Sequence, residues 1–179
     1  MPDLTKLPHN LDRSTGVCRA VIETPKGSRW KYDFDRSSKL FLLKSLLPEG
    51  MSFPADFGFI PSTLAEDGDP LDVMVLADEP TCVGALVSVR LIGALEAEEV
   101  EHGRTERNDR LLAVPELSRV YAGVKAASDL PDDYVDNLTQ FWINKDRLEG
   151  KAFRPLGVGE PMAAIELAHK ASRLAKKAA

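Results

Sequence analysis

The feature that most constrains the fold is a series of short strand-like segments that are separated by turn-forming residues. The predicted strands cover residues 16–23, 29–35, 39–44, 71–76, 83–96 and 110–116. Most of them are rich in β-branched residues or alternate between apolar and polar positions. Short strands of this kind favour an antiparallel barrel or sandwich over βαβ units. We therefore expect an α+β protein that is mainly β.

Helical periodicity appears only late in the chain. In residues 130–145, apolar side chains recur at helical spacing, which predicts a helix with a buried face formed by Leu130, Tyr134, Leu138, Phe141 and Trp142. A C-terminal helix is predicted from Pro161, with Met162, Ile165, Ala168 and Leu174 facing the core. The charged segment 96–110 is predicted to be a hairpin tip or a surface loop.

Length and composition narrow the class of protein. A chain of 179 residues predicts a single domain, residues 1–179. The net charge of -5 argues against a nucleic-acid module of the OB type, which needs a basic groove with exposed aromatic platforms. No apolar run is long enough for a membrane span, and the first residues resemble neither a signal nor a transit peptide, so we expect a cytoplasmic protein with no membrane partner.

The cysteines and histidines suggest no zinc site or thiol chemistry. Cys18 and Cys82 lie in apolar, strand-like contexts and are expected to be buried free thiols. The three histidines are scattered and do not show zinc-ligand spacing. The carboxylates are therefore the candidates for functional chemistry.

The stretch EDGDPLDVMVL crowds acidic residues against an apolar strand. Gly68 and Pro70 form turns, so one interpretation is a solvated acidic turn. In an extended segment, however, Asp67 and Asp69 point the same way, and a turn at Pro70 brings Asp72 back towards them. Three converging carboxylates suit a hard cation, Mg²⁺ or Mn²⁺. An EF-hand loop is excluded because its obligatory glycine position would be Asp72.

A divalent cation held by carboxylates usually serves phosphate chemistry, which also requires basic side chains. Lys31 and Asp33 alternate onto one face of their predicted strand, and Lys44 ends the next one. Arg110 begins a later strand, and Lys145 ends the first predicted helix. Taken singly, each is readily explained as surface charge; together with the acidic cluster they predict a site for a phosphate compound.

Several motifs resemble those of the soluble inorganic pyrophosphatases of the common bacterial and eukaryotic type. These motifs are DGDPLDV, with VIETP, WKYDFD and FPADFGFIPSTL before it and LLAVP after it, in matching order from about residue 17 to about residue 150. The resemblance implies a small OB-like antiparallel barrel with flanking helices and Mg²⁺-dependent hydrolysis of pyrophosphate to two phosphates. It also implies a homo-oligomer, which is a hexamer in bacterial members.

The resemblance also implies roles for individual residues. Asp67 and Asp72 match carboxylates that ligate the activating metals, and Asp69 matches the general base that takes a proton from the attacking water. Lys31 and Lys145 match lysines that contact phosphate. Glu23 matches an acidic residue at the edge of the metal site, and Asp33 stands where the family has glutamate.

The chain departs from the family pattern at several site positions. Lys44 replaces a phosphate-binding arginine, Phe53 and Phe57 replace tyrosines, and Asn144 replaces the tyrosine before Lys145. Arg110 replaces a lysine, and Asn108 stands where the family has a metal-binding aspartate. Asp109 and Glu99 or Glu101 are the candidate replacement ligands. The alternative function is a catalytically weakened protein of the same fold that binds phosphate or metal, or hydrolyses another phosphoanhydride.

Overall fold

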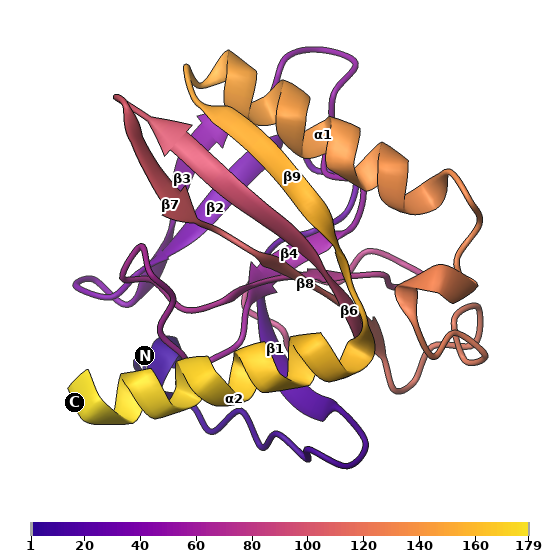
Figure 1. The fold of residues 1–179 in the computed structure, drawn as a ribbon. Helices are drawn as coiled ribbons and strands as arrows, with labels where there is room; N and C mark the ends of the chain where they lie inside the picture. The colour runs from indigo at the N-terminus through magenta and orange to yellow at the C-terminus, as the bar shows by residue number, and fades with distance from the viewer. Residues whose placement is uncertain (1, 179) are drawn as a thin grey trace.

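A computed structural model describes residues 2–178 as a curled, mostly antiparallel sheet flanked by two helices (Figure 1). The elements in chain order are η1 (Leu4–Lys6), β1 (Val17–Thr24), β2 (Trp30–Asp35), β3 (Leu40–Leu46), β4 (Asp56–Phe59), β5 (Asp72–Val75), β6 (Leu86–Glu101), β7 (Arg104–Arg107), β8 (Arg110–Pro115), η2 (Ala127–Asp129), α1 (Tyr134–Leu148), β9 (Ala152–Gly159) and α2 (Pro161–Ala178). The expected mainly β architecture with late helices is confirmed.

The main sheet has the strand order β1-β4-β5-β8-β6-β7, with β9 also paired to β6. It curls until β1 meets β6, without forming a regular barrel, in keeping with the OB-like fold predicted. One pairing departs from the antiparallel expectation, because β5 and β8 run parallel, with Asp72 opposite Arg110. β2 and β3 form a separate two-stranded ribbon.

Three strands were not predicted from the sequence. β4 lies in a short segment between prolines, and it approaches β1 so closely that a Cβ on Gly58 would lie 1.9 Å from the Val21 carbonyl oxygen. β9 contains Pro155, which weakens a strand pattern, although it pairs with β6 along most of its length. β7 pairs antiparallel with the end of β6. The charged segment 96–110 is therefore a hairpin, which was one of the two predicted alternatives, and not a surface loop.

The two helices pack on different parts of the sheet (Figure 1). α1 buries Leu138, Phe141 and Trp142 as predicted, in a core cluster that also holds Phe53 and Phe57. α2 packs mainly on β6 and buries Ala164, Ile165, Ala168, Ala171 and Ser172. Small residues let the helix approach the sheet closely.

Three predictions of burial were wrong. Met162 and Leu174 are 62% and 40% exposed, because the buried stripe of α2 is centred on its alanines and the two larger side chains lie beside it. Cys18 is buried, but Cys82 is exposed because its segment is a loop before β6 rather than part of the strand.

No helix within residues 2–178 combines the length and apolar character needed to cross a membrane.

Candidate active site

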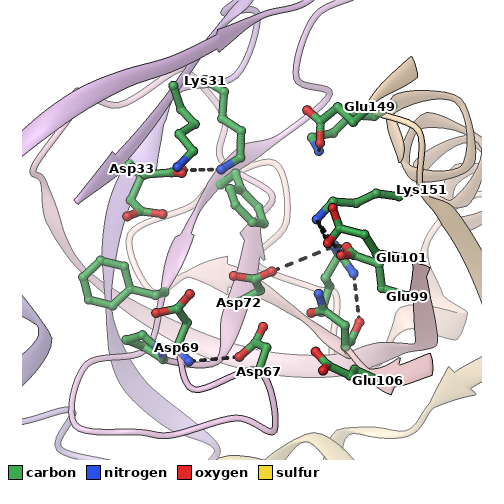
Figure 2. A pocket seen from close by; sticks show the side chains of 18 of the residues that line it. Lys31, Asp33, Asp67, Asp69, Asp72, Glu99, Glu101, Glu106, Glu149 and Lys151 are labelled. Atoms are coloured by element: carbon green, nitrogen blue, oxygen red, sulfur yellow. Dashed lines mark hydrogen bonds and ion pairs between the residues drawn. The ribbon is translucent and has the colours of Figure 1, made fainter. Parts of the chain in front are cut away.

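Charged side chains from distant parts of the chain line one cleft of about 890 Å³ (Figure 2). Its nine acidic side chains are Glu23, Asp33, Asp67, Asp69, Asp72, Glu99, Glu101, Glu106 and Glu149. Its seven lysine and arginine side chains are Lys31, Arg36, Lys44, Arg104, Arg110, Lys145 and Lys151. The cleft therefore offers both acidic and basic side chains, which suits a ligand made of an anion together with metal cations.

One side of the cleft, here called the turn wall, consists of β2, β3 and the turn at residues 66–72. Gly68 adopts a φ of +88°, and the Asp69 backbone N–H donates to the Asp67 carboxylate at 3.0 Å. Asp72 then begins β5. Figure 2 shows the three aspartates of this turn side by side. The Asp69 side chain is 76% exposed, and its Oδ1 lies 3.4 Å from a guanidinium nitrogen of Arg36.

Burial raises the pKa of several carboxyls that line the cleft. It raises the pKa of Asp72 to about 6, although Arg110 and Lys31 oppose the change. It also raises the pKa of Asp67, to which the negative charge of Asp69 adds. Glu23 behaves similarly, with a pKa raised by burial to about 8 even though its carboxylate accepts a 2.7 Å hydrogen bond from the Phe34 backbone N–H. Added positive charge near these groups would stabilise their ionised forms.

The β2–β3 ribbon places two lysines on the cleft. The predicted shared face of Lys31 and Asp33 is confirmed, since their side chains form an ion pair. Lys31 is paired with Ser45 and Tyr32 with Leu43, so Lys44 is an extra residue in the ladder. This bulge brings both Lys44 and Ser45 to the lining of the cleft.

The opposite side, here called the hairpin wall, consists of the β6–β7 hairpin, the end of α1 and the residues leading into β9. Lys151 Nζ lies 2.7 Å from Glu99 Oε1 and 3.2 Å from Glu101 Oε2. Lys145 Nζ lies 2.8 Å from Glu149 Oε2. Three acidic side chains of this wall, Glu99, Glu101 and Glu149, therefore have cationic partners within the chain (Figure 2).

Arg110 lies between the two walls and is only 3% exposed. Its guanidinium carbon is 3.9 Å from the centre of the Trp142 ring, a cation–π contact. Its nitrogens lie 4.0 Å from Asp72 Oδ2 and 3.9 Å from Glu99 Oε2. Its Nε has no hydrogen-bond partner within the part of the chain that the structure describes. A buried cation with an unused donor is well suited to an anionic ligand.

Most of the candidate site residues lie on this cleft. Those lining it are Glu23, Lys31, Asp33, Lys44, Phe57, Asp67, Asp69, Asp72, Glu99, Asn108, Arg110 and Lys145. Asp109 does not, because it alternates to the other face, where it accepts hydrogen bonds from the Ala97 N–H and the Arg107 side chain. Asn144 accepts a hydrogen bond from Arg147 and is also absent from the lining.

The sequence reasoning missed several charged residues of the cleft. Lys151, Glu149 and Glu106 line it on the hairpin wall, and Arg36 and Arg104 add positive charge. The pairing of β9 with β6 brings Lys151 to Glu99, which is 52 positions earlier in the chain. No local motif marks a contact over that distance.

The donor set fits a hard divalent cation, because it offers carboxylate oxygens whose ionised forms are destabilised by burial. The side chains do not form a finished cage, however. Among residues 2–178, no three acidic, histidine or cysteine side chains lie close enough together to hold a metal ion. Binding a cation would require the carboxylates of the turn wall to draw together.

Comparison with known proteins identifies the family. The family model described as inorganic pyrophosphatase matches residues 20–176. The chain belongs to the inorganic pyrophosphatase family. A relative with that name from Nostoc sp. is 39% identical over 155 residues, covering 87% of this chain and 88% of its own. One from Thermus thermophilus is 34% identical and covers 93% and 94%.

Solved structures of pyrophosphatases share the fold. The inorganic pyrophosphatase from Thermus thermophilus superimposes with a TM-score of 0.88 at 31% identity, covering 98% of this chain and 99% of its own. The enzyme from Helicobacter pylori gives a TM-score of 0.86 at 30% identity, covering 96% and 99%. The similarity thus spans the whole cleft, including the unpredicted strand β9.

Proposed function

We propose that the cleft between the two walls is the site at which this protein hydrolyses inorganic pyrophosphate to two phosphates. The family assignment makes the protein a hydrolase that acts on pyrophosphate. The observation that supports this cleft as its site is the lining itself, where carboxylates suited to cations face lysines and arginines suited to phosphate. No observation favours the alternative of a silent phosphate or metal binder.

Asp67 and Asp72 are the proposed ligands of the divalent cations that the family requires, with Mg²⁺ as the physiological ion and Mn²⁺ as a substitute. Both carboxyls have a raised pKa, with Asp72 partly buried and Asp67 on the exposed turn, and Asn108 offers a neutral oxygen on the same cleft. When bound, the cations neutralise phosphate oxygens and acidify a coordinated water. Asp109, directed away from the cleft, is not among the proposed ligands.

Asp69 is the proposed general base. Its side chain is 76% exposed, so its carboxylate is accessible to a water molecule in the cleft. Its backbone N–H anchors Asp67, which holds the base beside the proposed metal ligands. Asp69 would take the proton from the attacking water as the oxygen–phosphorus bond forms.

Four cations are proposed to bind the two phosphates: Lys31 and Lys44 from the turn wall, Lys145 from the hairpin wall, and Arg110 between them. Arg110 is the fixed element, since it is buried against Trp142. Lys31 and Lys145 are held by Asp33 and Glu149 and would exchange a carboxylate for a phosphate oxygen. Cations on both sides of the cleft would balance charge as the bridging bond breaks.

The test is release of phosphate from pyrophosphate by the purified protein over a series of Mg²⁺ concentrations. We expect Asp69→Asn to reduce turnover by roughly 1000-fold, as for loss of a general base, while still binding Mn²⁺. Asp132→Asn, on the exposed surface before α1, is the matched control and should keep full activity. Absence of release at every Mg²⁺ and Mn²⁺ concentration would refute the proposal.

Assembly and location remain predictions. A homo-oligomer, hexameric by family resemblance, is consistent with exposed apolar side chains on the β2–β3 ribbon, such as Trp30, Leu43 and Leu46. Sedimentation analysis of the purified protein would test it. The cytoplasmic location predicted from the sequence is also retained as a proposal.

A further inference from the structure

The two carboxylates near the end of β6 are occupied by a lysine of the same chain. Lys151 contacts Glu99 at 2.7 Å and Glu101 at 3.2 Å, and Glu99 also faces the Arg110 guanidinium at 3.9 Å. Figure 2 shows these side chains pointing towards one another on the hairpin wall. The chain itself therefore balances the charge of this acidic pair.

The backbone fixes this contact on both sides. Glu99 and Glu101 share one face of β6, because successive side chains of a strand alternate. β9 pairs with the same stretch, with Val100 opposite Ala152, so Lys151 enters the ladder beside Glu101. The Lys151 backbone N–H donates to the Asp146 carbonyl at 2.8 Å, which anchors it to the end of α1.

Asp67 and Asp72 differ in this respect from Glu99 and Glu101. Asp67 has no ion pair within residues 2–178, and the ion pair of Asp72 is with Arg110 at 4.0 Å. The other two aspartates of that wall, Asp33 and Asp69, pair with Lys31 and Arg36. On the hairpin wall, Lys151 places one positive charge in direct contact with both glutamates.

We propose that Lys151 is a built-in counter-ion that occupies Glu99 and Glu101, and so confines divalent cations to the turn wall at Asp67 and Asp72. The inference rests on the proposed function, because it assigns where the activating cations bind. It makes Lys151 a positioning residue that acts through two carboxylates. It also explains how a chain with Asn108 in place of an aspartate keeps two acidic groups nearby without using them as ligands.

The test is Mn²⁺ binding to the substrate-free protein, followed by the electron paramagnetic resonance signal of free Mn²⁺. Lys151→Met releases two carboxylates, so we expect Mn²⁺ to bind about 10-fold more tightly or one further ion to bind, because affinity follows the charge of the ligand set. Lys151→Arg should restore the original binding. Lys176→Met, which removes the same charge from the exposed end of α2, should change nothing.

A second variant keeps the inference testable if Lys151→Met fails to fold. Glu101→Gln removes an acidic group that Lys151 already neutralises, so Mn²⁺ affinity should change less than about 2-fold. Weaker binding by about 10-fold or more in Glu101→Gln would show that Glu101 is a ligand and overturn the inference. Unchanged or weaker binding in a folded Lys151→Met protein would overturn it too.

The same titration separates this inference from the proposed function. A wild-type protein that binds Mn²⁺ and releases phosphate, with unchanged binding in Lys151→Met, contradicts only the role of Lys151. A wild-type protein that neither binds Mn²⁺ nor releases phosphate contradicts both.

Discussion

The two walls of the cleft carry comparable charge but balance it differently. On the turn wall, three aspartates lie within six residues of one another, and burial raises the pKa of Asp67 and Asp72. On the hairpin wall, Glu99, Glu101 and Glu149 each have a lysine within ion-pair distance. Asp67 and Asp72 are therefore the carboxylates that we propose receive external cations, whereas Glu99, Glu101 and Glu149 already have lysine partners within the chain.

The largest expected effect comes from the residue that joins the walls. Arg110→Met removes the shared cation of Asp72 and Glu99 and should lower the free energy of unfolding by about 3 kcal/mol, because the partly buried Asp72 loses its ion-pair partner and Glu99 keeps only Lys151. Denaturant unfolding would measure this. Arg110→Lys should recover part of the loss, and a stability equal to wild type in Arg110→Met would show that the walls do not share this charge.

A smaller effect is expected at the turn wall. Asp67→Asn should weaken Mg²⁺ binding by roughly 10- to 100-fold, because it removes a carboxylate from a set of hard-cation ligands. Isothermal titration calorimetry without substrate would measure the affinity. Unchanged affinity would place the cations elsewhere and erase the proposed difference between the walls.

Lys44→Arg tests whether Lys44 binds the phosphate. The substitution keeps the charge and supplies the planar fork that can bind a phosphate through two hydrogen bonds. We expect the KM for pyrophosphate to fall by roughly 3- to 5-fold, with unchanged Mg²⁺ affinity. The reverse pattern, in which Mg²⁺ affinity changes and KM does not, would contradict the assignment of Lys44 to the phosphate.

The smallest effect is expected at Glu99. Since its carboxylate is already paired with Lys151, Glu99→Gln should shift the Mg²⁺ concentration for half-maximal activity by less than about 2-fold. Measured beside Asp67→Asn, this variant tests the comparison directly. If Glu99→Gln weakened Mg²⁺ binding as much as Asp67→Asn, the hairpin wall would also be a metal-binding surface.

The two walls also differ in how well the sequence predicts them. The aspartates of the turn and the pair Lys31 and Asp33 are close in sequence, so strand alternation and turn chemistry placed them on one side. The contact between Lys151 and Glu99 depends on β9, which contains a proline and was not predicted. Long-range strand pairing leaves no local pattern, and the same applies to the parallel pairing of β5 with β8.

Burial was predicted less well than secondary structure. Helical spacing identified the buried face of α1, because large apolar residues mark it, but it misplaced Met162 and Leu174 on α2, where alanines form the contact. Asp109 illustrates the converse. It was a candidate ligand from the sequence, but its neighbour Arg110 faces the cleft, so alternation along the strand directs Asp109 to the other side.

Trp142 gives the protein an optical reporter of its own cleft. Its indole is 1% exposed, lies beneath Arg110 and has its ring nitrogen 3.1 Å from the sulfur of Met74. The second tryptophan, Trp30, is 43% exposed on the β2–β3 ribbon, so its emission should lie at longer wavelength. Blue-edge fluorescence would therefore follow events beneath Arg110, and collisional quenchers in solution would act mainly on Trp30.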